Sequence, residues 1–446
     1  MEHIVIIGNG ISGITCARHI RKHSNYRITV ISSETEHFYS RTALMYIYMG
    51  HMTYEHTKPY EDFFWEENRI SLIYDYVKMV DPKDRLLIME KGDQVNYDKL
   101  IIATGSRPRL AGWPGEKLKG VQGLYGMPDL RQMEENTRGT KRAVVVGGGL
   151  IGVEMAEMLL TRDIPVTLFV REKTYWGHVL PPEEADIVSH HLREHHVDLR
   201  LKTELATIDD DGSGRVASVT TTEGEQIDCQ FVGLTIGVQP NIAFLKDSPV
   251  ETDKGILVNE YFETSVPDIY AIGDCVQHRN PPAGRKPVEQ IWYTGRIHGE
   301  TLAMTLTGTK TAYRPGVFFN SAKFFEIEYQ VYGDPQACMA DGHKSIYWEH
   351  SSRKKAIRIT FSAETGKVSS FNLMGVRYRH AVCDEWLKTG ADIKTVLENL
   401  ERANFDPEFH GKYEREVREI YNESPYKGQT VPVKRRSKNP LARLFG

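Results

Sequence analysis

Short apolar runs alternate with glycine-rich turns and with segments of helical periodicity through most of the chain. Residues 3–7 (HIVII) are apolar, residues 8–13 (GNGISG) hold three glycines, and the residues after them carry apolar side chains at helical spacing. This order predicts a buried strand, a tight turn and a helix. Residues 26–32 (YRITVIS) predict a second strand, which completes a strand–helix–strand unit.

The same pattern returns at residues 142–159 (RAVVVGGGLIGVEMAEML), which again predict a strand, a turn and a helix. Residues 97–109 and 264–275 each predict a further strand, ending in Ala-Thr-Gly and in Gly-Asp respectively. The second of these strands lies beyond the repeat, so the first unit is interrupted and then completed. The pattern predicts an α/β fold with two Rossmann-like dinucleotide-binding domains, the first of them discontinuous.

From residue 311 the pattern changes to the alternation of antiparallel strands. The alternating segments are 318–333, 344–350, 354–362 and 367–376, and helices are expected from about 381 to 421. We therefore expect a C-terminal α+β domain with a four- or five-stranded sheet. The first nucleotide-binding domain is expected at 1–111 with 239–310, and the second at 112–238. The C-terminal domain is 311–421, and a tail follows at 422–446.

The composition is that of a globular protein. Of 446 residues, 40% are hydrophobic and 26% are charged, and no run of eighteen apolar residues exists. The chain enters a strand at once, without a basic leader or a small-residue cleavage site, so a cytoplasmic location is expected. The cysteines are scattered and form no close pair, which predicts neither a disulfide framework nor a zinc or cluster site: Cys16, Cys229, Cys275, Cys338 and Cys383.

The net charge of −4 hides an excess of bases at the C-terminus. After Glu423 there is no acid, but there are six bases: Lys427, Lys434, Arg435, Arg436, Lys438 and Arg443. Bases mixed with apolar residues such as Leu441 and Phe445 are typical of peripheral contact with anionic lipid or with an acidic partner. A solvated chain end is the alternative. No nucleic-acid partner is expected.

The two glycine turns carry the candidate chemistry. Gly8, Gly10 and Gly13 fit G-x-G-x-x-G, in which the first glycine permits the turn, the second lets backbone approach a pyrophosphate, and the third lets helix pack on strand. Glu34 follows the second strand, where an acid can bind a ribose hydroxyl. The second copy has the same spacing, at Gly147, Gly149 and Gly152. Two such turns indicate two bound nucleotides.

Together, GNGISG, ATGSRPR, GGGLIGVE and YAIGDC resemble the two-dinucleotide-binding flavoproteins of the glutathione-reductase superfamily. The resemblance implies that FAD is bound by Gly8, Gly10, Ile11, Ser12, Gly13, Ser33, Glu34, Arg41, Ala103, Thr104, Gly105, Gly273, Asp274, Glu289, Gln290 and Trp292. It implies a nicotinamide nucleotide, NADPH or NADH, on Gly147, Gly149, Leu150, Ile151, Gly152 and Arg171. Residues 286–308 are expected to form a helix whose start approaches the flavin, as in relatives.

The segment HFYSRTALMYIYMG, residues 37–50, contains no cysteine where disulfide-reducing relatives carry one. Thiol–disulfide exchange needs a thiolate beside the flavin, so this reaction is not expected. Tyr39, Arg41 and Leu44 instead resemble the Y-x-R-x-x-L signature of rubredoxin and ferredoxin reductases, the nitrite reductase flavin domain and apoptosis-inducing factor. Arg41 is expected to pair with the FAD pyrophosphate, and a surface ion pair is the alternative.

Glu154 corresponds to a glutamate near the place where nicotinamide stacks on flavin. Many relatives pair it with a lysine, but Tyr46 stands at that position here, so Glu154 and Tyr46 are the catalytic candidates. An aromatic wall around the rings is also expected, with residues 60–67 (YEDFFWEE) contributing to it or packing in the core.

The end of the second strand of the second unit bears on coenzyme preference. NADH-selective relatives usually have an acid at the end of the second strand, where this chain has Val170 and then Arg171, which favours NADPH. A shift of one residue would instead make Glu172 the ribose ligand.

His191 and His195 stand four apart on an expected helix, a spacing that can bind metal. Relatives have a plain surface helix there, so no metal site is expected.

The predicted function is that of an FAD-dependent NAD(P)H oxidoreductase that passes hydride to flavin and electrons to a redox protein or a quinone-like acceptor. The alternative is a nucleotide-sensing, signalling flavoprotein with slow turnover, as apoptosis-inducing factor suggests. In relatives the C-terminal domain either forms a homodimer or covers the far side of the flavin.

Overall fold

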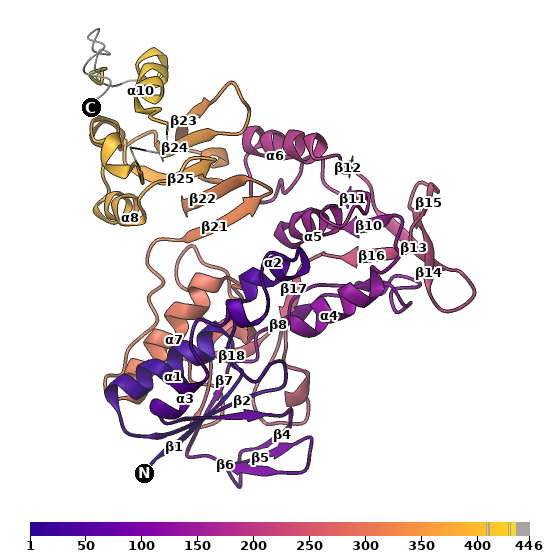
Figure 1. Cartoon of the computed structure of the whole chain (residues 1–446). Coiled ribbons are helices and arrows are strands. Elements are labelled where there is room, and N and C mark those ends of the chain that lie inside the picture. The colour runs from indigo at the N-terminus through magenta and orange to yellow at the C-terminus, as the bar shows by residue number, and fades with distance from the viewer. Residues whose placement is uncertain (407, 409–410, 427, 429, 434–446) are drawn as a thin grey trace. The chain divides into compact units, whose positions relative to one another are not determined.

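The computed structural model describes residues 1–446 except 407, 409–410, 427, 429 and 434–446, so most of the basic tail lies outside the described residues. The chain divides into two compact units (Figure 1). The first comprises Met1–Glu172 and His196–Pro315, and the second comprises Lys173–His195 and Gly316–Gly446. Each unit has its own buried hydrophobic cluster.

The first unit contains a parallel sheet with the strand order β19-β7-β1-β2-β3. Its strands are β1 (His3–Ile7), β2 (Arg27–Ser32), β3 (Ile70–Tyr74), β7 (Lys99–Ile102) and β19 (Ile269–Ala271). Helix α1 (Ile11–His23) follows β1, and α7 (Trp292–Leu306) lies beside α1 (Figure 1). Because β19 comes from far beyond the second glycine turn, the predicted discontinuous domain is confirmed.

A second parallel sheet in the same unit repeats this plan, with the order β12-β11-β10-β16-β9. Its strands are β9 (Val121–Gln122), β10 (Ala143–Val146), β11 (Val166–Val170), β12 (Asp198–Leu201) and β16 (Phe231–Leu234). Helix α5 (Leu150–Leu160) follows β10 directly, as α1 follows β1, and α4 (Met127–Asn136) precedes it. The two Rossmann-like sheets predicted from the glycine turns are both present.

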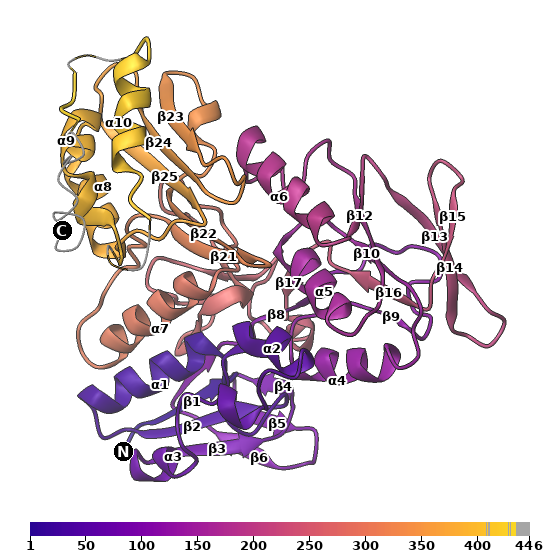
Figure 2. The ribbon, with the colours of Figure 1, turned by 45° about the horizontal axis from the view of Figure 1, so that its top comes forward.

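The second unit is built on a five-stranded antiparallel sheet with the order β21-β22-β25-β24-β23. Its strands are β21 (Phe319–Phe324), β22 (Ile327–Gly333), β23 (His343–Glu349), β24 (Ala356–Ser362) and β25 (Val368–Met374). The helices of this unit are α6 (Pro182–Glu194), α8 (His380–Thr389), α9 (Ile393–Glu398) and α10 (Glu414–Glu423). Figure 2 shows α8, α9 and α10 on one side of the sheet and α6 on the other.

Alternation along β24 explains this arrangement. Ile357 and Ile359 are buried in the cluster that also contains residues of α8 and α9. Arg358 points to the opposite face, where it pairs with Glu184 of α6. The sheet thus buries apolar side chains on one face and an ion pair on the other.

The remaining strands and helices are short and connect these sheets. They are α2 (Leu44–Tyr48), α3 (Phe63–Glu67), β4 (Val77–Asp81), β5 (Leu86–Met89), β6 (Gln94–Asn96), β8 (Ser106–Pro108), β13 (Leu205–Asp210), β14 (Val216–Thr221), β15 (Gln226–Asp228), β17 (Val238–Pro240), β18 (Ile256–Val258) and β20 (Val276–His278).

Two predicted segments are refined by the structure. The alternating segment 318–333 holds two strands, β21 and β22, joined by a turn at Phe325 and Glu326, so the sheet has the larger of the two expected strand numbers. The predicted helix 286–308 begins only at Trp292, because Lys286 precedes a proline and Ile291 is extended, with φ −130° and ψ 132°.

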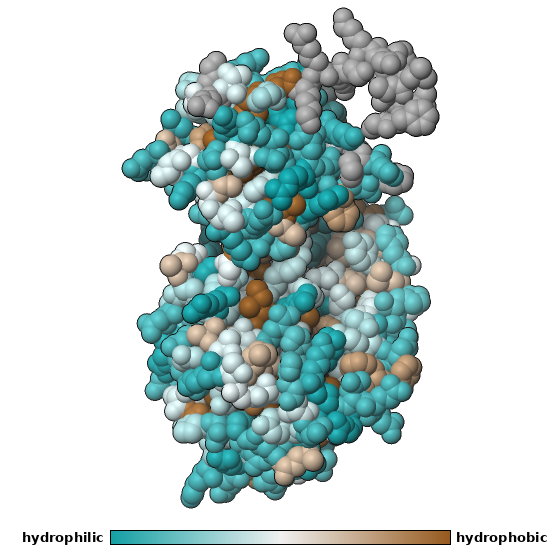
Figure 3. Space-filling model, turned by 90° about the vertical axis from the view of Figure 1, so that its left-hand side faces the viewer, coloured by the Kyte–Doolittle hydropathy of each residue, from teal (hydrophilic) through white to brown (hydrophobic). Residues whose placement is uncertain are grey.

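The surface of the described residues gives no sign of a membrane span. Within that part of the chain, no helix is long and apolar enough to cross a bilayer. The face in Figure 3 is mainly hydrophilic, and its hydrophobic residues lie in small groups.

Candidate functional site

A cavity of about 490 Å³ lies in the first unit, at the carboxyl edge of its first sheet. Parallel strands end at one edge, so the segments after β1, β2, β7 and β19 meet there. Among its lining residues are thirteen that were predicted to bind FAD: Gly8, Gly10, Ile11, Ser12, Ser33, Glu34, Arg41, Ala103, Thr104, Gly105, Gly273, Asp274 and Trp292.

The first glycine turn has the geometry that a bound diphosphate requires. Gly8 has φ +113°, and a Cβ there would lie 2.1 Å from the carbonyl oxygen of Ala103. A Cβ on Gly13 would lie 2.1 Å from the carbonyl oxygen of Gly8, so this glycine lets α1 approach the turn. A Cβ on Gly10 would meet nothing within 4 Å. Gly10 therefore presents bare backbone to the cavity at the start of α1, where the helix end favours an anion.

Glu34 is fixed by its neighbours at the cavity wall. Arg41 donates two hydrogen bonds to its carboxylate, at 2.9 and 2.7 Å, and Met127 donates a third from its backbone N–H at 2.9 Å. The hydroxyl of Tyr39 also donates to it. Burial alone would raise the pKa of Glu34, but these donors hold the pKa below its usual value. Arg41 is thus paired with Glu34 at the cavity wall.

Asp274 is held by a residue that the sequence did not single out. The hydroxyl of Tyr125 donates to Asp274 Oδ2 at 3.1 Å and accepts from the backbone N–H of Ser106 at 2.9 Å. The guanidinium of Arg41 lies 4.5 Å from the Tyr125 ring centroid. Burial raises the pKa of Asp274, and Tyr125 and Arg41 oppose that rise. Tyr125 therefore links two carboxylates of the cavity lining, Asp274 directly and Glu34 through Arg41.

The second glycine turn repeats the first in detail. Gly147 has φ +127°, and its Cβ would lie 2.4 Å from the carbonyl oxygen of Thr235. A Cβ on Gly152 would lie 2.3 Å from the carbonyl oxygen of Gly147, whereas one on Gly149 would meet nothing within 4 Å. The matching open position indicates that the second turn also presents backbone to a ligand.

Helix α5 contributes Ile151 and Glu154 to the cavity lining. Glu154 is half-buried, and burial together with the charge of Glu157 raises the pKa of its carboxyl to about 7. Within the part of the chain that the structure describes, no hydrogen bond or ion pair of the Glu154 side chain is found. The residue expected to replace its usual lysine partner, Tyr46, stacks on His51 with ring centroids 6.1 Å apart.

The structure does not bring every predicted site residue to the cavity wall. Those that lie outside its lining are Gly13, Tyr46, Gly147, Gly149, Leu150, Gly152, Arg171, Glu289 and Gln290. Glu289 is buried and held by Arg285 at 2.6 Å. Gln290 lies outside the lining but donates to Oγ of Ser106, a lining residue, at 2.6 Å. Arg171 donates to Glu172 at 2.8 Å on the surface.

Aromatic side chains contribute to the described cavity lining, Phe38, Tyr39 and Trp292 among them. Tyr60 and Trp65 of the 60–67 segment instead pack in the core of the first unit, which was the alternative for that segment. Asn9, Asp75, Tyr125, Asn241 and Phe244 also line the cavity and were not predicted. Asn9 and Ser106 lie within predicted motifs, but nothing local in the sequence marks Asp75, Tyr125 or Phe244.

The described cavity lining contains no cysteine thiol. Cys16, Cys229, Cys275 and Cys383 are buried, and Cys338 is partly so. Burial raises the pKa of Cys275 to about 11, so this thiol is protonated near neutral pH.

These features fit FAD. An open backbone position at Gly10, a helix start beside it and oriented carboxylates at Glu34 and Asp274 match diphosphate, ribose and polyol groups in turn. Two parallel sheets, each with such a turn at its carboxyl edge, define the class: a two-dinucleotide-binding oxidoreductase.

Comparison with known proteins agrees with this class. Residues 2–296 match the family described as pyridine nucleotide-disulphide oxidoreductase. The chain is 32% identical over 286 residues to a rubredoxin-NAD(+) reductase of Acinetobacter baylyi, covering 62% of this chain and 72% of that protein. It is 27% identical to the nitrite reductase [NAD(P)H] of Bacillus subtilis, covering 84% of this chain but only 44% of that much longer protein.

A solved structure, the covalent putidaredoxin reductase–putidaredoxin complex, has a TM-score of 0.76 at 21% identity and covers 94% of this chain and 98% of that one. The chain belongs to the pyridine nucleotide-disulphide oxidoreductase family. It is an FAD-dependent oxidoreductase that uses NAD(P)H.

Proposed function

We propose that the protein transfers reducing equivalents from NAD(P)H through FAD to a small redox protein of the rubredoxin or ferredoxin type, without a redox disulfide. The observation that carries the proposal is the combination of an FAD-type cavity with a described lining that lacks cysteine. FAD, when bound, supplies the hydride acceptor and the source of electrons for the partner. The chain must supply binding, orientation and exclusion of water.

Each role has candidate residues. Glu34 and Asp274 bind hydroxyl groups, Gly10 and the start of α1 bind the diphosphate, and Ile151 and Glu154 line the wall next to the second glycine turn. Glu154, with a pKa of about 7, can donate or accept a hydrogen bond to an amide close to neutral pH. Phe38 and Trp292 are apolar parts of the wall that help to exclude water.

The class of acceptor follows from resemblance and not from a substrate pocket. Relatives in sequence include a rubredoxin reductase, and a relative in fold was solved with its protein partner, putidaredoxin. A quinone-like acceptor is the other candidate, since an apolar ring would suit the aromatic lining at Phe38, Tyr39 and Trp292. The two acceptors differ in their need for lipid.

An acceptor screen tests the proposal. The purified protein, with NADH or NADPH, is assayed with rubredoxin, ferredoxin, a soluble quinone, oxygen and an aromatic disulfide. We expect reduction of an iron–sulfur carrier at least tenfold faster than of oxygen or the disulfide, before and after alkylation of thiols. Turnover that is lost on alkylation would overturn the sulfur-free mechanism. Activity that requires quinone and lipid would replace the carrier protein by a quinone.

One observation favours a second candidate, a nucleotide-sensing flavoprotein with slow turnover. Glu154 has no side-chain partner among the described residues, whereas many relatives pair it with lysine. Stopped-flow measurement of flavin bleaching separates the two functions, because reduction that takes minutes would favour the sensor. In either case Glu154→Ala is expected to slow bleaching and to leave FAD content unchanged. Loss of FAD from this variant would show that Glu154 has a different role.

A further inference from the structure

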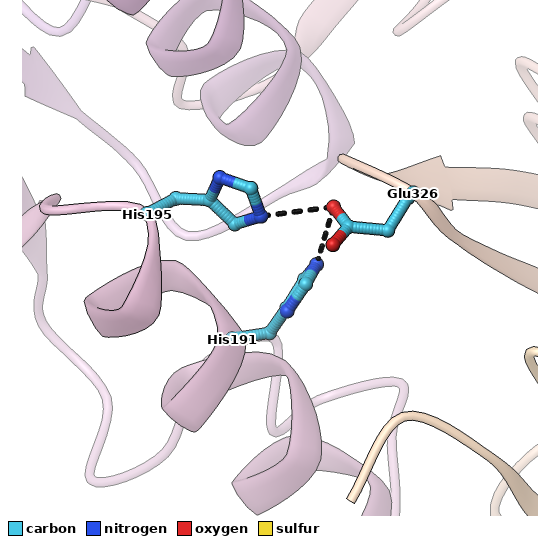
Figure 4. A group of neighbouring side chains, drawn as sticks. All are labelled: His191, His195 and Glu326. Carbon is cyan, nitrogen blue, oxygen red and sulfur yellow. Dashed lines mark hydrogen bonds and ion pairs between the residues drawn. The ribbon is translucent and has the colours of Figure 1, made fainter. Parts of the chain in front are cut away.

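Two histidines of the α6 segment and a glutamate of the β21–β22 turn converge in the second unit (Figure 4). His191 Nε2 lies 3.0 Å, and His195 Nε2 2.8 Å, from the same atom, Oε2 of Glu326. The three possible ligand atoms all lie within 4.8 Å of one another. The side chain of His191 is 1% exposed, but those of His195 and Glu326 are 34% and 54% exposed. One side of the group is therefore open to water.

Two of the three spacings between the possible ligand atoms are close to those around a tetrahedral divalent ion, and the third, between the two imidazole nitrogens, is within 4.8 Å. Ligand atoms about 2.0–2.1 Å from a tetrahedral zinc ion lie about 3.3 Å apart. The two N···O distances, 3.0 and 2.8 Å, need to open by only a few tenths of an ångström. His195 and Glu326 are exposed enough to make that movement. Two imidazoles and one carboxylate are a known zinc ligand set, and they leave a fourth position for water.

Both imidazoles are held in the orientation that a ligand needs. His191 Nδ1 lies 3.3 Å from Oε2 of Glu194, so a proton on Nδ1 can be donated there while the Nε2 lone pair faces Glu326. A carboxylate behind a ligating histidine is the usual arrangement in zinc sites. The ring of His195 stacks on Phe325, with centroids 4.2 Å apart and an interplanar angle of 11°.

The turn that carries Glu326 is unusual. It has two residues, Phe325 and Glu326, and Phe325 has φ +51°. Glycine or asparagine normally occupies such a position because a bulky side chain is strained there. An ion bound through Glu326 would stabilise this turn against the end of α6.

One neighbouring charge opposes a cation. Lys354 Nζ lies 3.2 Å from Oε1 of Glu326 and 3.5 Å from Oε2 of Glu194. Its side chain is 39% exposed, so the ammonium can move toward water when an ion binds. Repulsion by this charge weakens the site without blocking it, which makes Lys354 a useful position for a test.

We propose that His191, His195 and Glu326 form a binding site for a divalent transition-metal ion, with zinc the ion that best suits the ligand set. The ion ties the end of α6 to the β21–β22 turn within the second unit. Glu194 is a positioning residue for His191. This site is independent of the proposed redox function.

Zinc binding to the full-length, tag-free, FAD-loaded protein tests the proposal. After treatment with a chelator, the protein is titrated with zinc chloride by calorimetry, and thermal unfolding is followed with and without zinc. We expect one tight equivalent per chain and a higher unfolding temperature. X-ray absorption of the bound zinc should show imidazole scattering and no sulfur.

Variants on the exposed side of the group make the test specific. Glu326→Gln and His195→Ala are each expected to weaken zinc binding at least tenfold while flavin absorbance is unchanged. Lys354→Met should strengthen binding several-fold, because the repulsive charge is gone. His190→Ala is the matched control, since His190 is on the same helix and pairs with Glu194 at 3.4 Å without facing Glu326. The proposal is overturned if the wild type binds no zinc, or if Glu326→Gln binds it as tightly.

Discussion

The guanidinium of Arg41 holds the carboxylate of Glu34 through two hydrogen bonds, Nη1 to Oε1 at 2.9 Å and Nη2 to Oε2 at 2.7 Å. The same Nη1 donates to the carbonyl oxygen of Tyr125 at 3.0 Å. The acid after β2, the 37–50 segment and the start of α4 are thereby joined into one wall of the cavity. A fork-to-fork pair fixes both position and direction, which a single contact would not do.

Replacing Glu34 should therefore damage FAD binding more than its one expected contact with ribose implies. In Glu34→Gln the carboxylate that pairs with Arg41 is neutralised and Arg41 loses its charged partner, so we expect FAD affinity to fall by about tenfold or more, or ~1.4 kcal/mol. Fluorescence titration of the FAD-free protein measures the effect. Glu36→Gln, at an exposed position two residues on, is the control and should bind FAD like the wild type.

Tyr125→Phe removes a single hydroxyl that serves two partners. Ser106 would lose the acceptor for its backbone N–H, and Asp274 would lose a donor. Leaving a buried N–H unpaired costs about 1–3 kcal/mol, so we expect a stability loss of that order and weaker FAD binding. Urea unfolding and FAD titration measure both. Tyr74→Phe, in a side chain that is 49% exposed, should change neither, and equal effects in the two variants would contradict this role for Tyr125.

The glycine turns were predicted from the sequence and Tyr125 was not, and the difference has a physical cause. The glycine turns and their flanking strands were predicted correctly because their signals are local: apolar runs of strand length, and glycines at fixed spacing where a Cβ would collide with backbone. Tyr125 was not predicted, because its role depends on Ser106, 19 residues away, and Asp274, 149 residues away. A tyrosine in such a segment has no distinguishing pattern.

The position of the β21–β22 turn was not predicted, for a related reason. Phe325 adopts φ +51° without being glycine, so the local sequence reads as continuous strand. The turn is enforced by pairing of the two strands and by packing of Phe325 on His195. Glu326 lies 131 residues beyond His195, so the histidine pair alone did not reveal the carboxylate that faces it.

Arg358 and Glu184 form an ion pair that should dominate the stability of the second unit. Arg358 is 5% and Glu184 0% exposed, and two hydrogen bonds of 2.7 and 2.9 Å join them. Arg358→Met would leave a buried, unpaired carboxylate and is expected to cost about 3–5 kcal/mol. Thermal unfolding measures this loss, and the double variant Arg358→Met/Glu184→Leu should recover much of it. Arg353→Met, which breaks the exposed pair with Asp186, should have little effect.

Coenzyme preference is expected to depend on Arg171. Strand β11 ends in Val170, which is fully buried. The first polar side chain after this strand is Arg171, which is 75% exposed. If the arginine pairs with the extra phosphate of NADPH, Arg171→Ala should lower kcat/KM for NADPH about tenfold or more and leave that for NADH nearly unchanged. Glu172→Ala is the matched variant. A loss confined to NADH in Glu172→Ala would show that the glutamate binds the ribose and that NADH is preferred.

The carboxyl of Glu154 should make stability depend on pH. Burial beside Glu157 raises its folded-state pKa from 4.5 to about 7. The folded protein therefore holds a proton that the unfolded chain releases, and this stabilisation is full below pH 4.5 and is lost as the pH rises through 7. The glutamine of Glu154→Gln is neutral at every pH, so the variant does not lose stability as the pH rises through 7. Its stability relative to wild type should rise by about 1–3 kcal/mol between pH 5 and pH 8, after allowance for water in the cavity. Urea unfolding at the two pH values measures the difference, and a constant difference would mean that Glu154 titrates as an ordinary exposed carboxyl.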